Sequence, residues 1–332
     1  MRFLVTGAAG FIGFHLARRL LTEGHTVYGL DGFTPYYDQT LKRRRHELLA
    51  EHSQFTGREL MLEDAARLAD CVGAAAADVV IHLAAQAGVR YSAENPRAYI
   101  DSNIVGSFHL FEAMKQHRCR HLIVASTSSV YGANVEQPFH EGQPTDRPLS
   151  LYAATKRAVE ALAHSHAYQF HLPTTVVRFF TVFGPWGRPD MAFFKFTKNI
   201  IEGRSIDVYG FGNMTRDFTY VDDVVEAVRR LTDRPPAPDD PDIATPAGPG
   251  VPCRIVNIGC GQPVGLEDFI RVIETEIGRK AIRRELPMQT GDMAATWADT
   301  SRLERLTGFR PSTPLARGIH EFVAWYRNYY CL

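Results

Sequence analysis

The first 180 residues alternate between short apolar runs and longer amphipathic stretches. Apolar runs bounded by turn residues predict buried strands, whereas apolar residues repeated every three or four positions predict helices. Strands are expected at 1–6, 26–30, 78–83, 121–125 and 174–178. Helices are expected after the turn 7–13 and through residue 21, at 96–117 and at 150–171. This alternation predicts an α/β fold with a Rossmann-type, doubly wound parallel sheet.

Beyond position 183 the pattern breaks into shorter pieces, with helices expected at 191–203, 221–232 and 265–278 and strands at 206–209 and 254–257. We assign residues 1–180 to a dinucleotide-binding domain and residues 181–332 mainly to a smaller C-terminal α/β lobe that binds substrate. The segment 233–252 holds seven prolines, which remove main-chain donors, so we expect a flexible surface insertion there.

A glycine-rich turn joins the first strand to the first helix, with the sequence Gly7-Ala-Ala-Gly10-Phe11-Ile12-Gly13. Gly7 permits a tight turn, Gly10 lets the main chain approach a pyrophosphate, and Gly13 allows the helix to pack closely on the strand. The spacing is GxxGxxG, whereas the usual dinucleotide fingerprint is GxGxxG. Strand, glycine turn and helix together predict a dinucleotide site at the helix N-terminus.

Asp31 ends the second strand, about twenty residues past the glycines, where a carboxylate accepts hydrogen bonds from the adenosine ribose. This position favours NAD over NADP, because a 2′-phosphate would be repelled. The cationic run Lys42 to Arg45 follows closely. We interpret the run as the solvated face of a helix, with a phosphate clamp as the alternative.

Tyr152 and Lys156 are four residues apart within a predicted helix, so their side chains share one face. An ammonium beside a phenol favours the phenolate and lowers the phenol pKa, which would make Tyr152 a usable base. The spacing alone is also compatible with a solvated surface pair. The expected strands place Leu83, Ala84, Ala85, Thr127 and Thr181 at the same carboxyl edge of the sheet, where ligands bind in such folds.

Composition narrows the class of protein. The chain has 332 residues, 45% of them hydrophobic, and a formal net charge of zero, without a basic stripe for nucleic acid or an apolar run for a membrane span. Five scattered cysteines lack metal-ligand spacing, and thirteen histidines form no ligand constellation, so we expect reduced thiols, a cytoplasmic location and no metal. The expected strand at the first residue leaves no room for a signal peptide.

The motifs resemble those of extended short-chain dehydrogenases/reductases, and among them the UDP-glucuronate 4-epimerases, over nearly the whole chain. The glycine loop, Thr127, Tyr152 and Lys156 match the superfamily. The narrower group is matched by Tyr36-Tyr37-Asp38, His82 to Tyr91, Phe183 to Ala192, Arg216 to Asp223 and Leu286 to Asp292.

The resemblance implies a bound NAD that is reduced and reoxidised within one turnover of a UDP-sugar. Tyr152 would take the proton of the sugar 4-hydroxyl, Lys156 would hold the phenolate and the nicotinamide ribose, and Thr127 would bond the same sugar oxygen. Further contacts to the cofactor are assigned to Gly7, Gly10, Phe11, Ile12, Gly13, Asp31, Leu83, Ala84, Ala85 and Asn103. The product would be the C4 epimer, UDP-galacturonate.

Substrate contacts follow from the same resemblance. Arg216 matches a diphosphate contact and Asp292 a residue near the nucleotide sugar; a salt bridge from Arg216 to Asp217 or Asp222 is the alternative. Many relatives carry arginine where this chain has Gln289, and Arg90 is the candidate to compensate.

Oxidation of C4 in a glucuronate produces a β-keto acid, which loses carbon dioxide when the breaking bond aligns with the carbonyl π system. Donors on the carboxylate would prevent that alignment, and the candidates are Ser128, Ser129, Thr181 and Arg188, besides Thr127. Turn formation by the serines and loop capping by Arg188 are the alternatives. Ser128 and Ser129 stand where related dehydratases carry Asp-Glu, so dehydration is not expected.

Two rival functions stay open: another nucleotide-sugar reaction, either UDP-glucose epimerisation or UDP-glucuronate decarboxylation, and a noncatalytic NAD-binding regulator. The resemblance also implies a homodimer, because in the superfamily helices such as those expected at 96–117 and 150–171, with their apolar stripes, pair across a dimer axis.

Overall fold

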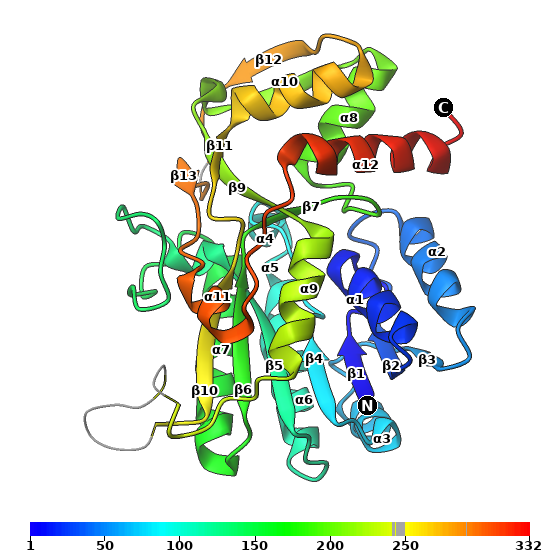
Figure 1. Ribbon diagram of the computed structural model, residues 1–332, viewed down its shortest axis with the longest axis vertical. Coiled ribbons are helices and arrows are strands. Elements are labelled where there is room, and N and C mark those ends of the chain that lie inside the picture. Colours follow the sequence, from blue (N-terminus) through cyan, green and yellow to red (C-terminus); the bar gives the residue numbers. More distant parts are fainter. Residues whose placement is uncertain (241–242, 244–249, 290) are drawn as a thin grey trace.

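The computed structural model of this chain describes residues 1–240, 243, 250–289 and 291–332. Its centre is a parallel sheet of seven strands (Figure 1). From one edge to the other, the strands are β10 (Cys253–Ile258), β6 (Thr174–Phe179), β5 (His121–Thr127), β4 (Val79–His82), β1 (Arg2–Thr6), β2 (Thr26–Asp31) and β3 (Phe55–Glu59). The predicted doubly wound parallel sheet is confirmed.

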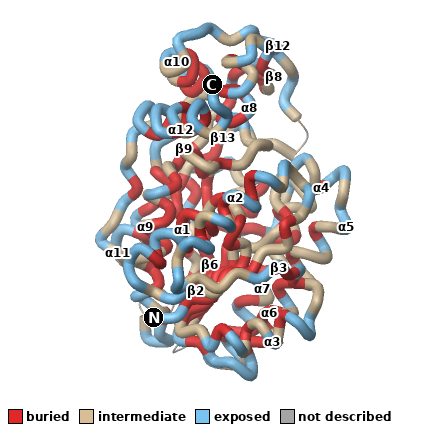
Figure 2. Tube along the Cα trace, turned by 90° about the vertical axis from the view of Figure 1, so that its right-hand side faces the viewer, coloured by how far each residue is buried: buried red, intermediate tan, exposed pale blue. Residues whose placement is uncertain are grey.

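Alternate residues of each strand enter two separate hydrophobic cores, one on each face of the sheet. Phe3 and Val5 of β1 pack in one core, whereas Leu4 between them packs in the other. In β5, Ile123 and its neighbour Leu122 divide in the same way. Because both faces are covered, the central strands are largely apolar, and Figure 2 shows much of the sheet as buried.

Helices cover both faces of this sheet. Those of the first 180 residues are α1 (Phe11–Thr22), α2 (Gln39–Ala50), α3 (Ala65–Ala75), α4 (Tyr91–Glu94), α5 (Pro96–Tyr99), α6 (Gly106–Met114) and α7 (Leu151–Phe170). The helix expected at 96–117 is interrupted by a π-helical segment, Ile100–Val105, between α5 and α6. Neither β3 nor α3 was predicted from the sequence; β3 is short and contains no fully buried residue.

The smaller lobe lies beyond the carboxyl edge of the sheet (Figure 1). It contains a four-stranded sheet of β7 (Thr181–Phe183), β9 (Thr215–Tyr220), β11 (Pro263–Gly265) and β13 (Ala295–Thr296), and a pair of β8 (Ser205–Tyr209) with β12 (Ile282–Leu286). Its helices are α8 (Ala192–Glu202), α10 (Leu266–Ile277) and α12 (Leu315–Tyr329).

Three elements from the second half of the chain return to the large sheet. Strand β10 pairs with β6, α9 (Val221–Thr232) packs beside α1, and α11 (Ser301–Thr307) packs against α9 and β10. The division at residue 180 stays a prediction. The predicted flexible insertion 233–252 lies partly outside the described residues; within its described part, Asp240 pairs with Arg254 at 3.1 Å.

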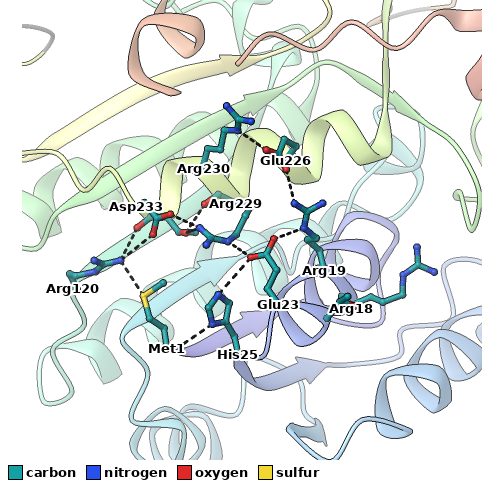
Figure 3. A network of polar contacts seen from close by, with 12 residues as sticks. Met1, Arg18, Arg19, Glu23, His25, Arg120, Glu226, Arg229, Arg230 and Asp233 are labelled. Carbon is teal, nitrogen blue, oxygen red and sulfur yellow. Dashed lines mark hydrogen bonds and ion pairs between the residues drawn. The ribbon is translucent and has the colours of Figure 1, made fainter. Parts of the chain in front are cut away.

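Polar side chains at the solvent edge join α1 to α9 (Figure 3). The Glu23 carboxylate accepts hydrogen bonds from Arg19 at 2.5 Å and from Arg229 at 2.6 Å, and Arg19 also pairs with Glu226 at 3.1 Å. These groups are partly exposed, so each pair contributes little, and the network mainly orients the two helices.

A buried ion pair fixes α7 against the sheet. Arg178 of β6 donates to both carboxylate oxygens of Glu160 on α7, at 2.9 and 2.8 Å, and Ser126 of β5 donates to the same carboxylate at 2.6 Å. Arg178 and Glu160 side chains are each 2% exposed. The pair therefore sets the position of α7, which carries Tyr152 and Lys156, relative to the end of β5, which carries Thr127.

None of the helices in the described ranges has the length and hydropathy that a membrane span requires.

Candidate functional site

A cavity of about 840 Å³ opens at the carboxyl edge of the large sheet, beneath the smaller lobe. Of the residues predicted to bind cofactor or substrate or to catalyse, all except Asn103 line this cavity. The structure therefore brings together residues from the whole length of the chain, from Gly7 to Asp292.

The glycine turn has the geometry of a phosphate cradle. Gly7 has φ +74°, in the left-handed region that favours glycine, and a Cβ on Gly13 would lie 2.0 Å from the Gly7 carbonyl oxygen. Helix α1 starts at Phe11, so its first N–H groups lack acceptors within the helix and face the cavity end of the turn. These features fit the pyrophosphate of a dinucleotide.

Asp31 completes the cofactor half of the cavity. Its carboxylate accepts hydrogen bonds from the N–H groups of Ala9 at 3.0 Å and Phe33 at 2.9 Å, which fix its orientation and leave lone pairs for a ribose. The arrangement fits the adenosine side of NAD, as the sequence predicts.

The interpretation of Lys42 to Arg45 as one solvated face is wrong. Arg43 and Arg44 are exposed and pair with Glu59 and Glu47, but Lys42 is 7% exposed and Arg45 is fully buried. The Lys42 ammonium donates to the carbonyl and hydroxyl oxygens of Thr34, both at 3.1 Å, at the edge of the cavity. Four consecutive residues span about one turn of a helix. Since α2 packs one side against the rest of the protein, the four cations cannot all face solvent.

Asn103 lies behind the cavity wall. Its side-chain oxygen accepts from the Gln86 N–H at 2.7 Å, and its amide donates to the Gln86 carbonyl at 3.0 Å and to Thr155 at 2.9 Å. The Thr155 hydroxyl in turn donates to the Tyr152 carbonyl at 2.9 Å. Asn103 thus supports the residues after β4 and the first turn of α7 from within the π-helical segment.

Tyr152 and Thr127 meet at the centre of the cavity. Burial raises the pKa of Tyr152, while the nearby Arg188 cation and a hydrogen bond with Thr127 act to lower the pKa. We expected Lys156 to be the cation that lowers the Tyr152 pKa, but the net shift in the unliganded protein is upward, and Arg188 is the cation with the main effect. The tyrosine is thus protonated at neutral pH before ligands bind.

Lys156 is a buried ammonium beside the cavity. It is 4% exposed, and burial lowers its pKa to about 8, with Glu160 one turn further along α7 acting in the opposite direction. Within the described ranges no carboxylate lies in ion-pair distance of Lys156.

Ser128 and Ser129 both form a turn and line the cavity. They begin a short 3-10 helix, Ser128–Tyr131, in which the Thr127 hydroxyl accepts from the Ser129 N–H at 3.2 Å. Thr181 faces them from the start of β7. The turn holds several hydroxyl donors at one point of the cavity.

Arg188 is held by a carboxylate that sequence reasoning did not identify. Its guanidinium donates to both oxygens of Asp190, at 3.0 and 2.6 Å, and Tyr36 donates to the same carboxylate at 3.1 Å. Burial acts against the charge of each partner, yet the pair raises the pKa of Arg188 and lowers that of Asp190. The sequence contains one sign of this ion pair, because an aspartate lies two positions after the arginine. The contact of Tyr36 with that aspartate could be identified only from the fold.

Two arginines and one aspartate meet elsewhere in the cavity. Arg216 donates to the carbonyls of Thr215 at 2.9 Å and Ala294 at 3.2 Å, and among the described residues it forms no salt bridge, to Asp217 or otherwise. Burial lowers its pKa, Asp292 raises it and Arg90 lowers it further. Arg90 pairs with Asp292 at 3.3 Å and lies 4.5 Å from the Tyr209 ring centroid. Gln289 does not line the cavity.

Comparisons with known proteins agree with this geometry. Residues 3–245 match the model of the NAD dependent epimerase/dehydratase family. The chain is 53% identical to a probable UDP-glucuronate 4-epimerase of Rhizobium meliloti, over 99% of this chain and 98% of that protein. It is 43% identical to UDP-glucuronate 4-epimerase 4 of Arabidopsis thaliana, over 98% of this chain and 75% of that protein.

Among solved structures, the UDP-glucuronic acid 4-epimerase of Bacillus cereus, in complex with UDP-glucuronic acid and NAD, has a TM-score of 0.89 and 33% identity. The match covers 99% of this chain and 100% of that chain.

The buried charge of Lys156 leads to a stability prediction for the cofactor-free protein. Its pKa falls from 10.5 in the unfolded chain to about 8 in the folded protein, so Lys156 is charged in both states at pH 7. At this pH, burial of the charged ammonium therefore lowers the free energy of unfolding by its full amount. Lys156→Met should therefore raise the free energy of unfolding at pH 7 by roughly 1–3 kcal/mol while abolishing turnover. Above pH 8 the folded wild type loses this proton and its disadvantage shrinks, and it vanishes above about pH 10.5.

Urea unfolding of both proteins at pH 7 and pH 10 measures the difference. Lys198→Met, on α8 outside the cavity, is the control and should change stability by less than about 0.5 kcal/mol at either pH. A Lys156→Met protein less stable than wild type at pH 7 would contradict the assignment of a destabilising buried charge.

Proposed function

We propose that this chain, which belongs to the NAD dependent epimerase/dehydratase family, interconverts UDP-glucuronate and UDP-galacturonate by inverting C4 of the sugar. The observation that carries the proposal is the position of Arg188. Arg188 lines the cavity together with Tyr152, and its charge acts on Tyr152 more strongly than that of any other charged group among the described residues, so a carboxylate bound by Arg188 would lie close to the hydroxyl that Tyr152 deprotonates. A glucuronate has its carboxylate in that relation to C4.

The cofactor half of the cavity fits NAD, which supplies a hydride acceptor and donor when bound. Gly7, Gly10 and the first turn of α1 would hold its pyrophosphate, Asp31 its adenosine ribose, and Leu83 to Ala85 would line its path toward Tyr152.

Tyr152 removes the proton from the sugar 4-hydroxyl while C4 loses a hydride. The unliganded tyrosine is protonated, so it needs nearby positive charge to act as a base, and Arg188 and Lys156 provide that charge in a site where burial excludes water. Thr127 holds the oxygen on which the proton transfer occurs. The 4-keto sugar then rotates within the site and accepts a hydride at C4 on its other face, and Tyr152 returns the proton to the C4 oxygen.

The carboxylate must stay out of alignment with the new carbonyl group, because a β-keto acid in alignment loses carbon dioxide. Arg188 supplies a charged donor from one loop, and the hydroxyls of Ser128 and Ser129 supply donors from another. Thr181 adds a hydroxyl from β7. Two independent sets of donors restrain rotation of the carboxylate better than one.

The diphosphate is assigned to Arg216 and Arg90. Arg216 is partly buried and has only main-chain acceptors among the described residues, so an anion would restore the charge balance that burial disturbs. Arg90 already pairs with Asp292 and supplies the second cation, which compensates for the uncharged Gln289.

The protein is further proposed to act as a homodimer in the cytoplasm. Ile100 and Phe108, about two turns apart in the helical stretch before β5, are 36% and 45% exposed, and a second copy would cover them. All five cysteines are free thiols, as expected in a reducing compartment. Light scattering at micromolar concentration should give twice 37.2 kDa, and cell fractionation tests the location.

Incubation of the purified protein with UDP-glucuronate should produce UDP-galacturonate, separated by chromatography. UDP-pentose together with carbon dioxide would instead identify a decarboxylase, and no product at all would favour a noncatalytic regulator. Tyr152→Phe should lower the rate by about 10²–10⁴-fold, since the proton then has no acceptor, while thermal shifts still report binding of NAD and UDP-glucuronate. An active Tyr152→Phe protein would exclude the assigned base.

Arg188→Ala tests whether the substrate carries a carboxylate. Loss of a desolvated charged donor is expected to lower kcat/KM for UDP-glucuronate by about 30-fold or more, because such a contact contributes at least about 2 kcal/mol. Turnover of UDP-glucose, if detectable, should fall far less. Equal losses for the two sugars would mean that Arg188 acts on the tyrosine or the loop and not on a carboxylate.

A further inference from the structure

The loop Gly184 to Asp190, which presents Arg188 to the cavity, is held from several sides. The imidazole Nε2 of His15, on α1, lies 2.8 Å from the Pro185 carbonyl oxygen. The Trp186 ring packs at 5.5 Å from Phe14 of α1 and at 5.2 Å from Trp325 of α12, measured between centroids. Since α1 begins at the glycine turn, these contacts already connect the loop to the cofactor half of the cavity.

Arg45 makes the most direct connection. One guanidinium nitrogen, Nη1, donates to the carbonyl of Ala9 in the glycine turn at 3.0 Å and to the Tyr37 hydroxyl at 3.1 Å. The other, Nη2, donates to the carbonyls of Trp186 and of Gly187, the latter at 3.2 Å. A single side chain therefore joins the main chain that cradles the dinucleotide to the main chain next to Arg188.

The burial of Arg45 indicates that its contacts belong to the packed interior of the protein and not to a solvated surface. Its residue exposure is 0%, and in the described part of the chain no carboxylate pairs with it, so the charge is balanced by main-chain carbonyl groups and the Tyr37 side chain. A planar guanidinium has five donors in a rigid fork and can bridge two segments at once, whereas a lysine ammonium acts as a point charge. Its neighbour Arg44 points to solvent and pairs with Glu47.

We propose that Arg45 is a positioning residue that couples the glycine turn to the Arg188 loop, so that a dinucleotide in the turn improves the site for the substrate carboxylate. An anion bound by the turn restricts the Ala9 carbonyl and hence Arg45. Arg45 then restricts the carbonyls of Trp186 and Gly187, and less conformational freedom is left to be lost when the carboxylate binds Arg188. Coupling of this kind is reciprocal between the two ligands.

The inference rests on the proposed function, because it takes UDP-glucuronate as the ligand of Arg188. The test measures binding and uses ADP-ribose in place of the whole cofactor. ADP-ribose has the pyrophosphate that the glycine turn would hold but lacks the nicotinamide. It therefore lacks the ring that would lie against the reacting sugar, so coupling is measured without that direct contact.

Isothermal titration calorimetry on the full chain, freed of bound nucleotide, gives the Kd of UDP-glucuronate with and without saturating ADP-ribose. In the wild type we expect ADP-ribose to tighten binding about fivefold or more, within the usual range for coupled sites. In Arg45→Gln the factor should fall below about twofold. UDP, which has no sugar carboxylate, should show little coupling in either protein.

Arg44→Gln is the matched control, since it removes a guanidinium from the adjacent position and should keep the wild-type coupling factor. If Arg45→Gln does not fold, Arg45→Lys replaces it: coupling below about twofold supports the inference, and wild-type coupling overturns it. Coupling absent from the wild type, or retained in Arg45→Gln, also overturns it. If UDP-glucuronate does not bind the wild type under either condition, the proposed function fails, and the inference with it.

Discussion

The site depends on cationic side chains that are removed from water and are not paired with a carboxylate. Burial lowers the pKa of both Lys156 and Arg216, and within the described ranges neither has a carboxylate in ion-pair distance. Such groups destabilise a folded protein unless a ligand balances them. Under the proposed function, the diphosphate of the nucleotide sugar would balance Arg216, and the Tyr152 phenolate would balance Lys156 during the reaction. Arg188 differs, because Asp190 already balances its charge.

The parallel sheet makes this concentration of charge possible. Strands β1, β2, β4, β5 and β6 all end at one edge of the sheet. The loops that follow them therefore meet at the cavity, although the loops are far apart in the sequence. The periodicity of apolar residues was sufficient to predict this arrangement, since buried parallel strands are apolar on both faces. It was not sufficient for β3, whose five residues are only partly buried, or for the π-helical turn that carries Asn103.

The site residues that carry a motif could be predicted, and those that support them could not. Tyr152, Lys156, Thr127 and the glycines are recognisable because their spacing is dictated by a helix turn or a strand end. Tyr36 and Arg45 act through contacts to residues 154 and 141 positions away, a relation that no local pattern encodes. Arg45 was wrongly predicted to face solvent for a further reason. In a run of four cations, the sequence does not indicate which side chains face inward.

Epimerisation requires motion in one part of the site and rigidity in another. The keto sugar must expose both faces to the same hydride position, so the contacts to its ring have to be few. Its carboxylate, however, must not rotate into line with the carbonyl during that motion. Under the proposed function, the donors for the acid lie on short segments that are held by several contacts. The 3-10 turn after β5 is closed by the Thr127 hydroxyl, and the Arg188 loop is held by Arg45 and by the Trp186 ring between α1 and α12. A looser loop would still let C4 be oxidised, but it would allow the acid to reach the geometry in which carbon dioxide leaves. The proposed function therefore makes selectivity between epimerisation and decarboxylation depend on the main-chain supports as well as on the residues that would touch the sugar.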